Sequence, residues 1–535
     1  MFKLDLQEKK INQGLLGLFI LFGLYCAIKA TRGLILPVEQ DDFRDMSIAE
    51  NMLHGLYLKD PTYQNELLWY NPLLPAIDAF VSHITGLPMN IVVTHIGKFF
   101  SPLIPISIYY MGLKLFNPKI ALATAVACLF FVCGNEYAEH TSGYTYIWLA
   151  LCFSQVPFYL IIAFTNKTLP GNKNLNYLLL GFFAGILFLV HSAPSFLFCI
   201  VLICCFLHAF IKKEITFKQL ITRGLLFSFA LLLTGSPLLY SVFVHYHYHI
   251  KNVDPMQWVA FILEPEQASI LFKETVNIYF VIAMVGLIYL IKNKTLPKIA
   301  NRIVLYWVFC SAAIFFYVYS IVFLRTKYNI ILPGFVPSSD AFFCVKSAES
   351  ILFGIGFWQI ITWVFTKWGG KLKLSYLAIF YAVLLVMVAV RAPRYYRRKE
   401  FTLLRTNTLE KQQGAYADMD IYTWLKKNTD INDVVLCKMD QAIFPVMASG
   451  RKMVVANTYY SSPYISYLDR KADADSMLAG LNTTNHLQPA FDKYNVKYIL
   501  LPVNELKAYP QAPLYFPDVV YTDSSFIVRK SHSMQ

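Results

Sequence analysis

The stretch EQDDFRDMSIAENMLHG, residues 39–55, decides how the rest of the chain is interpreted. It follows a long apolar run and contains two adjacent carboxylates, Asp41 and Asp42. Apolar residues then recur at helical spacing (48, 49, 52, 53 and 56), while polar residues share the other side. This pattern is typical of a helix along a membrane surface with one face in lipid. A pair of carboxylates at this position can take a proton from an acceptor substrate. The alternative interpretation of the stretch is a solvated loop followed by a surface helix.

Composition indicates an integral membrane protein. Hydrophobic residues make up 56% of the 535 residues and charged residues 15%, whereas soluble domains carry about 25% charged residues. The net charge of +14 does not indicate a nucleic-acid partner, because the basic residues cluster in connectors between apolar runs. The ten cysteines lack paired spacing, so we expect small apolar fillers rather than disulfides or metal ligands.

The apolar runs predict about 11 transmembrane helices, in a transmembrane domain at 1–391. The first run can cross about 30 Å of hydrocarbon, and every second connector is basic. This alternation predicts a cytoplasmic N-terminus and a tail on the outer side. The first outer loop, 37–89, is expected to hold a second surface helix at 71–88. The expected spans lie at about 12–36, 90–113, 120–135, 144–164, 176–191, 194–211, 221–243, 275–291, 303–324, 347–366 and 374–391.

The composition after residue 391 is that of a soluble domain, 392–535. Strands that alternate with helices favour a small extracytoplasmic α/β domain. It contains no glycine-rich phosphate loop, HExxH motif or nucleophile triad. We therefore expect it to cover the outer face or bind acceptor. The expected strands are 434–438, 453–457 and 496–502, with a hairpin at 517–530 and helices at 420–428 and about 487–494.

The first-loop stretch resembles that of the GT-C class of integral membrane glycosyltransferases, including the protein O-mannosyltransferase and aminoarabinose-transferase branches. The family pattern there is D-E-x-R-Y-A-E-I-x-x-x-M-L. The departures are Asp42 for Glu, Asp45 for Tyr and Ser47 for Glu. The tail pattern of WLKKN, ASGRK and KYNVKYILLP is also similar to outer domains of bacterial members. The resemblance implies a GT-C-like membrane fold that carries the soluble α/β domain at its C-terminal end.

The resemblance also implies a reaction, in which an acceptor attacks a sugar carried on a polyprenyl phosphate. It assigns Asp41 as the base and Asp42 as its support or as an anchor for the acceptor. In the second outer loop Glu139 is the preferred carboxylate. For the phosphate we nominate Arg325 and Lys327, with Lys346 in reserve, because cations near an anionic leaving group stabilise developing charge. The structural alternative for Arg325 and Lys327 is that they anchor the end of a span at the membrane interface. The alternative for Glu139 is a helix cap or a solvated side chain.

The partners implied are a polyprenyl-phosphate-linked sugar donor, a lipid, glycan or protein acceptor, and membrane lipids, in a bacterial inner membrane. The WWDYG signature of the metal-using oligosaccharyltransferase branch is absent. We therefore predict no cofactor and no obligatory metal. The competing function is a non-enzymatic lipid or polysaccharide flippase or transporter. A polysaccharide polymerase or ligase is a third, although those place key residues in a large late outer loop.

Overall fold

The computed structural model describes residues 2–531 except 38–40, 133–147, 170, 172, 253–275, 293–295, 331, 333–337, 369–375, 399–405, 407–417, 440–441, 458–459 and 483–486. The chain forms two compact units. The membrane unit comprises Met1–Arg32, His95–Ser236 and Trp258–Arg405. The loop–tail unit comprises Gly33–Thr94, Pro237–Gln257 and Thr406–Gln535, and so groups the first outer loop with the tail.

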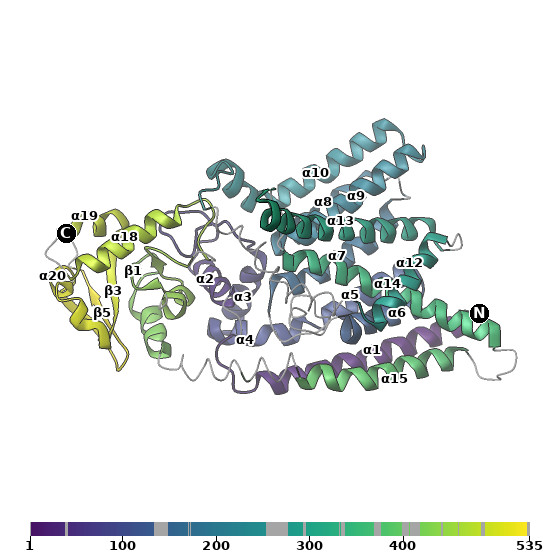
Figure 1. Cartoon of the computed structure of the whole chain (residues 1–535), viewed down its shortest axis with the longest axis horizontal. Coiled ribbons are helices and arrows are strands. Elements are labelled where there is room, and N and C mark those ends of the chain that lie inside the picture. The colour runs from purple at the N-terminus through teal and green to yellow at the C-terminus, as the bar shows by residue number, and fades with distance from the viewer. Residues whose placement is uncertain are drawn as a thin grey trace. The chain divides into compact units, whose positions relative to one another are not determined.

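Every apolar run that was expected to span the membrane contains a helix (Figure 1). These elements are α1 (Phe2–Thr31), α4 (Met89–Phe100), α5 (Leu103–Leu115), α6 (Pro118–Val126) with the π-helical η1 (Ala127–Phe131), α7 (Ala150–Thr168), α8 (Asn174–Val190), α9 (Ser192–Ile211), α10 (Phe217–Leu239) with η3 (Tyr240–His245), α12 (Ile278–Lys292), α13 (Lys298–Tyr328), α14 (Ser338–Trp368) and α15 (Tyr376–Arg398).

Seven helical segments of the described chain are long and apolar enough to cross a membrane. They are Glu8–Thr31, Met89–Leu115, Ser192–Ile211, Phe217–His245, Lys298–Val318, Phe343–Lys367 and Tyr376–Pro393. The other four expected runs hold α6 with η1, α7, α8 and α12, of which all but α7 are shorter apolar helices. The prediction of an α-helical multi-pass membrane protein is therefore confirmed.

Polar contacts fix the N-terminal helix within the membrane unit. Asn12 on α1 donates from Nδ2 to the carbonyl oxygen of Pro118 at 2.9 Å. Its Oδ1 accepts a hydrogen bond of 2.6 Å from the hydroxyl of Tyr381 on α15, and α1 and α15 lie side by side in Figure 1. Glu8 forms an ion pair of 2.9 Å with Lys119 at the start of α6. The two ends of the transmembrane sequence are thereby joined through one asparagine.

Glycines allow α12 and α14 to approach each other closely. A Cβ atom on Gly286 would lie 2.1 Å from the carbonyl oxygen of Leu352, and one on Gly356 would lie 1.9 Å from that of Ile282. Both distances are far below van der Waals contact. Lipid supplies no hydrophobic driving force between helices, so close packing at small residues is what holds such a pair together.

The first loop and the tail share one apolar core in the loop–tail unit. Met46, Ala49 and Met52 of α2 (Asp41–Leu53) belong to a buried cluster with residues of α3 (Leu73–Thr85) and of the tail. The polar side of α2 is buried too, including Arg44 and Glu50. The expectation that α2 places one face in lipid is wrong, because its apolar residues are buried in this cluster with α3 and the tail. A helix is present where the second surface helix was expected, in α3, which exposes apolar side chains; its place at the membrane surface stays a prediction.

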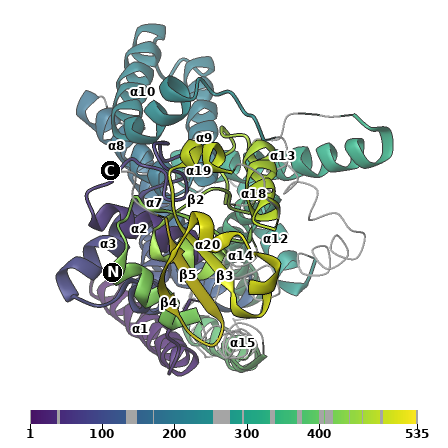
Figure 2. The same cartoon turned by 90° about the vertical axis from the view of Figure 1, so that its left-hand side faces the viewer.

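The tail is a small α/β fold around a five-stranded sheet of order β2-β1-β3-β5-β4. β1 pairs in parallel with β2 and β3, whereas β5 is antiparallel to β3 and β4; Figure 2 shows β3, β5 and β4 next to one another. Helix α18 was not predicted. The elements are a helix at 418–428, β1 (Val434–Leu436), η5 (Ala442–Val446), η6 (Met447–Ser449), β2 (Lys452–Met453), α18 (Tyr467–Gly480), α19 (Gln488–Tyr494), β3 (Val496–Pro502), η7 (Val503–Ala508), α20 (Ala512–Tyr515), β4 (Asp518–Thr522) and β5 (Phe526–Lys530).

Replacing Gly356 with Ala should destabilise the membrane unit, because the new methyl group would overlap the carbonyl of Ile282 and force α12 and α14 apart. Overpacking of this kind costs about 1–3 kcal/mol. The measurement is the thermal unfolding temperature of the detergent-purified protein. Gly224→Ala on α10 is the matched control, since nothing lies within 4 Å of its Cβ position. Equal unfolding temperatures for the two variants would contradict the close approach.

Candidate functional site

The two predicted carboxylates of α2 differ sharply in exposure. Asp41 is the first residue of the helix and its side chain is 51% exposed, whereas the side chain of Asp42 is buried. An aspartate in the first turn is stabilised by the positive end of the helix dipole. Asp41 is therefore the member of the pair that a substrate from solvent or the membrane surface can reach.

Arg44 holds the beginning of α2 through a buried guanidinium, which lies 3.6 Å from the centroid of the Tyr70 ring. It pairs with Asp45 at 3.0 Å and reaches Asp41 at 3.7 Å. Burial opposes the charge of Arg44, but Tyr70 and the two aspartates outweigh it and raise the pKa of the guanidinium above its ordinary value. Burial raises the pKa of Asp45 despite its pairing with Arg44. A permanently charged arginine thus lies beside the exposed carboxylate and orients it.

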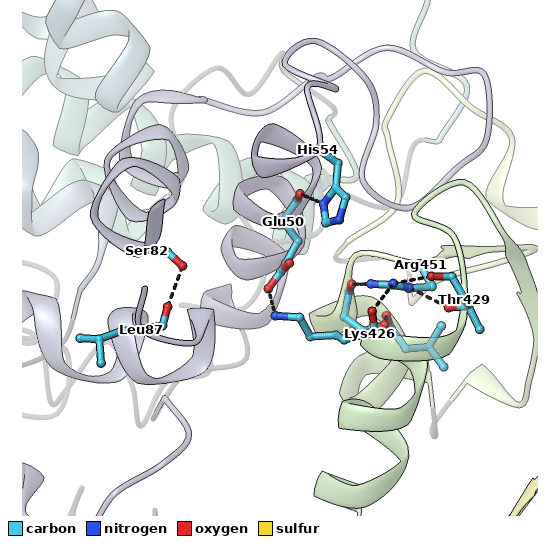
Figure 3. Close-up of polar contacts among 9 residues, drawn as sticks. Glu50, His54, Ser82, Leu87, Lys426, Thr429 and Arg451 are labelled. Atoms are coloured by element: carbon cyan, nitrogen blue, oxygen red, sulfur yellow. Dashed lines mark hydrogen bonds and ion pairs between the residues drawn. The ribbon is translucent and has the colours of Figure 1, made fainter. Parts of the chain in front are cut away.

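The middle of α2 is bound to the tail by a second ion pair. Glu50 is buried and pairs with Lys426 on the helix 418–428 (Figure 3). Arg451 fixes the end of that helix, donating to the carbonyl oxygen and the hydroxyl of Thr429 at 2.7 and 2.9 Å. Gly450, with φ of +80°, lets the tail approach, because its Cβ would lie 2.9 Å from the Cβ of Glu50. Only glycine meets both conditions at this position.

A buried lysine joins α2 to the loop that follows it. The ammonium of Lys452 donates to Oδ1 of Asn51 at 3.0 Å and to the carbonyl oxygens of Asp60 and Pro61 at 2.7 and 3.2 Å. Burial lowers the pKa of Lys452 to about 8, although Asp60 opposes this shift. Burial likewise raises the pKa of Asp60 to about 6. Hydrogen bonds from the backbone N–H groups of Tyr63 and Thr62, and the charge of Lys452, act in the opposite direction.

The other predicted site residues lie outside this unit. Arg325 and Lys327 are on α13 in the membrane unit, and the ammonium of Lys327 lies 5.3 Å from the centroid of the Phe323 ring. Lys346 on α14 forms a buried ion pair of 2.8 Å with Glu349, which the sequence had not suggested. Glu139 falls outside the described residues. Convergence of the basic residues with the carboxylates of α2 stays a prediction.

Sequence reasoning missed the residues that hold α2 in place. Lys452 and Arg451 belong to the ASGRK segment, which entered the sequence analysis only as part of the tail resemblance. Lys98 was also missed, although it stands within an expected span. Its buried ammonium bonds to Oγ1 of Thr31 and Nδ1 of His95, both at 2.9 Å. A charged residue inside an apolar run is the signal that could have identified it.

Among the described residues there is no group of three or more His, Cys, Asp or Glu side chains placed to hold a metal ion. The groups at the beginning of α2 that can take part in a reaction are the exposed carboxylate of Asp41, the buried carboxylate of Asp42 and the guanidinium of Arg44, which pairs with Asp41. This arrangement can accept a proton from a hydroxyl or amine positioned at the beginning of the helix.

Comparison with solved structures shows that the chain has the fold of GT-C glycosyltransferases. No family model matches the chain, and no curated protein does, but solved structures do. ArnT from Cupriavidus metallidurans bound to undecaprenyl phosphate has a TM-score of 0.57 at 14% identity, covering 97% of this chain and 98% of that chain. The Archaeoglobus fulgidus oligosaccharyltransferase tethered to an acceptor peptide has a TM-score of 0.57 at 12% identity, covering 93% and 70%. The same organism's AglB, in complex with an inhibitory peptide and a dolichol-phosphate, has a TM-score of 0.54 at 13% identity, covering 93% and 71%.

The buried Lys452 predicts a pH-dependent stability of the loop–tail unit. Its folded-state pKa of about 8 lies below the ordinary 10.5, so the unfolded chain binds more protons between these values. Stability should therefore rise with pH in that window and fall as pH drops through about 8. Hydrogen–deuterium exchange of peptides covering β1 and β2, corrected for intrinsic exchange, measures this. Lys452→Met should abolish the rise and the exposed-site control Lys471→Met should keep it; a rise retained in Lys452→Met would assign it to other groups.

Proposed function

We propose that the chain is an inverting glycosyltransferase that moves a sugar from a polyprenyl-phosphate carrier to a lipid, glycan or protein acceptor. The reaction takes place at the outer face of a bacterial inner membrane, with the N-terminus cytoplasmic and the tail extracytoplasmic. The observation that carries the proposal is the reachable carboxylate of Asp41, oriented by Arg44 on the first-loop helix of a GT-C fold. The neighbours solved with undecaprenyl phosphate and dolichol-phosphate support this donor class.

In the proposed reaction Asp41 accepts the proton of the acceptor nucleophile. The nucleophile attacks the anomeric carbon, the bond from that carbon to the carrier phosphate oxygen breaks, and the bonding electrons leave with the phosphate. Attack opposite to the leaving group inverts the anomeric configuration. Asp42 supports Asp41 or anchors the acceptor, and Glu139 completes the acceptor side. Arg44 acts as a positioning residue, because its guanidinium pairs with the base rather than with substrate.

The departing phosphate requires positive charge. Arg325, Lys327 and Lys346 are assigned to it, since cations preorganised at a developing anion stabilise the transition state. The ammonium of Lys346 donates a hydrogen bond of 2.8 Å to Glu349, and the departing phosphate is assigned to the same ammonium.

A flippase or transporter is the second candidate function. It is favoured by ionisable groups buried within spans, namely Lys98 and the pair of Lys346 with Glu349. Such groups mark substrate pathways in transporters. The assay for the main proposal separates the two functions, because a flippase binds the lipid-linked sugar without cleaving it.

Replacing Asp41 with Asn should lower the transfer rate at least about 100-fold, because the amide cannot accept the proton and general bases contribute about 10²–10⁴-fold to the rate. The measurement is transfer from radiolabelled polyprenyl-phosphate sugars to cell-envelope acceptors by the purified full-length protein. Asp469→Asn, at an exposed aspartate of α18, is the charge-matched control and should keep wild-type activity. Full activity in Asp41→Asn would refute the assignment of the base. Donor binding without turnover by the wild type would favour the flippase.

The role of Lys346 needs a paired design. Lys346→Met leaves Glu349 buried and unpaired, which costs about 3–5 kcal/mol, so lost activity alone would not identify a phosphate ligand. The double variant Lys346→Met/Glu349→Met removes both charges and should recover the unfolding temperature. If Lys346 binds the phosphate, the double variant should still show a KM for the donor raised about tenfold, as expected for a lost charged contact. A wild-type KM in the folded double variant would exclude that role.

A further inference from the structure

A pocket of about 530 Å³ lies in the membrane unit, lined by residues of α9, α12 and α13 and of the connector before α13, and none of the residues assigned to glycosyl transfer is among them. Figure 1 shows where these three helices lie in the membrane unit. The wall of the pocket combines cationic, polar and apolar side chains. It is lined by His208, Ile291, Leu296, Lys298, Asn301, Arg302, Leu305, Tyr306 and Phe309. The connectors at this end of the helices are the ones that the basic residues predict to be cytoplasmic.

The polarity of the pocket changes along α13. Lys298 begins the helix, and Arg302 and Tyr306 follow at intervals of four residues, which places all three on one side. Farther along α13, Phe309 is 55% exposed. Cations at the helix start with an exposed apolar group beyond them match a molecule with an anionic head and a hydrocarbon chain. Basic pockets between membrane helices bind lipid headgroups in this way.

The guanidinium of Arg302 is fixed and still has hydrogen-bonding capacity. Its Nη1 and Nη2 each lie 2.7 Å from an oxygen of Glu214. These bonds use two of its five N–H donors, so other donors are available to a phosphate. Tyr306 is also fixed, because its hydroxyl lies 2.7 Å from Nδ1 of His208. The polar part of the pocket is thus preorganised rather than formed by loose surface side chains.

The side chain of Asn301 indicates which second polar group the ligand carries beside its phosphate. Its Nδ2 donates to the carbonyl oxygen of Leu290 at 3.1 Å, which identifies the other side-chain atom as the oxygen. That Oδ1 is buried and has no hydrogen-bond partner among the described residues. A buried acceptor without a donor costs about 1–3 kcal/mol. A ligand with a hydroxyl close to its phosphate would satisfy this atom, whereas a bare phosphate offers mainly acceptors.

We propose that this pocket binds an anionic glycerophospholipid with a hydroxylated headgroup. Its phosphate accepts hydrogen bonds from Lys298 and Arg302, and a headgroup hydroxyl donates to Oδ1 of Asn301. The acyl chain lies along the exposed apolar side chain of Phe309. Glu214, which pairs with Arg302, disfavours a doubly charged phosphate monoester such as a polyprenyl phosphate, because like charges repel. The site is independent of glycosyl transfer.

The test is native mass spectrometry of the full-length protein titrated with phosphatidylglycerol, phosphatidylcholine, undecaprenyl phosphate and inorganic phosphate. Phosphatidylglycerol should bind at least about fivefold more tightly than the other three, which corresponds to one basic contact near a membrane surface. Lys298→Gln should weaken its binding about fivefold. Lys292→Gln changes the same charge at the exposed end of α12, outside the pocket lining, and should leave the affinity unchanged.

Each alternative result overturns the assignment in a different way. Equal binding of phosphatidylcholine would show that no anionic headgroup is recognised. Tighter binding of undecaprenyl phosphate, lost in Lys298→Gln, would make this a carrier site instead. An equal loss of phosphatidylglycerol affinity in Lys298→Gln and Lys292→Gln would show that general surface charge, and not this pocket, attracts the lipid. The unfolding temperature of each variant, measured without lipid, establishes that it is folded, so weaker binding cannot be attributed to unfolding.

Discussion

The burial of charged groups along α2 is the constraint on which the loop–tail unit depends. Glu50 pairs with Lys426, and Lys452 fills the acceptors of Asn51 and of two loop carbonyls. Each buried charge would cost several kcal/mol without a partner, so the helix can occupy this position only when the tail has folded against it. The same requirement explains Gly450, since a side chain there would separate the tail from Glu50 and remove the partners.

These contacts lie in the middle and at the end of α2, and the proposed site lies at its beginning. Burial lowers the pKa of Lys452 and raises that of Asp60, so both shifts favour the neutral side chain. The surrounding hydrogen bonds and charges therefore do not fully offset the cost of burying these two groups. We infer that the cluster serves to fix the helix rather than to maximise stability. A base must be held within about 0.5 Å of its productive position by supporting side chains. In the proposed mechanism Arg44 provides that support for Asp41, and the cluster holds the helix that carries both.

The sequence predicts the architecture because lipid and α/β patterning leave strong periodic signals. Apolar runs located the membrane helices, and the strand at 496–502 matches β3 residue for residue. Helix α18 was missed because few of its positions are buried, among them Ala474 and Met477, so its apolar periodicity is weak. The environment of α2 was mispredicted for another reason. Its two faces were correctly distinguished, but the residues that cover the polar face, such as Lys452, lie about 400 positions away, and periodicity within one segment carries no information about them.

The same distinction separates what could and could not be predicted about the site. Asp41 could be nominated because its motif is local, whereas the burial of the pair formed by Lys346 and Glu349 depends on which sides of α14 are covered. That pairing has a consequence for the proposed catalytic cycle. A lone cation buried among spans would be costly whenever no donor is bound, and a carboxylate one helical turn away removes that cost. We infer that an incoming phosphate adds to the ion pair rather than neutralising a bare charge. Donor affinity is then moderated, and the spent carrier can leave without exposing an unpaired charge to lipid.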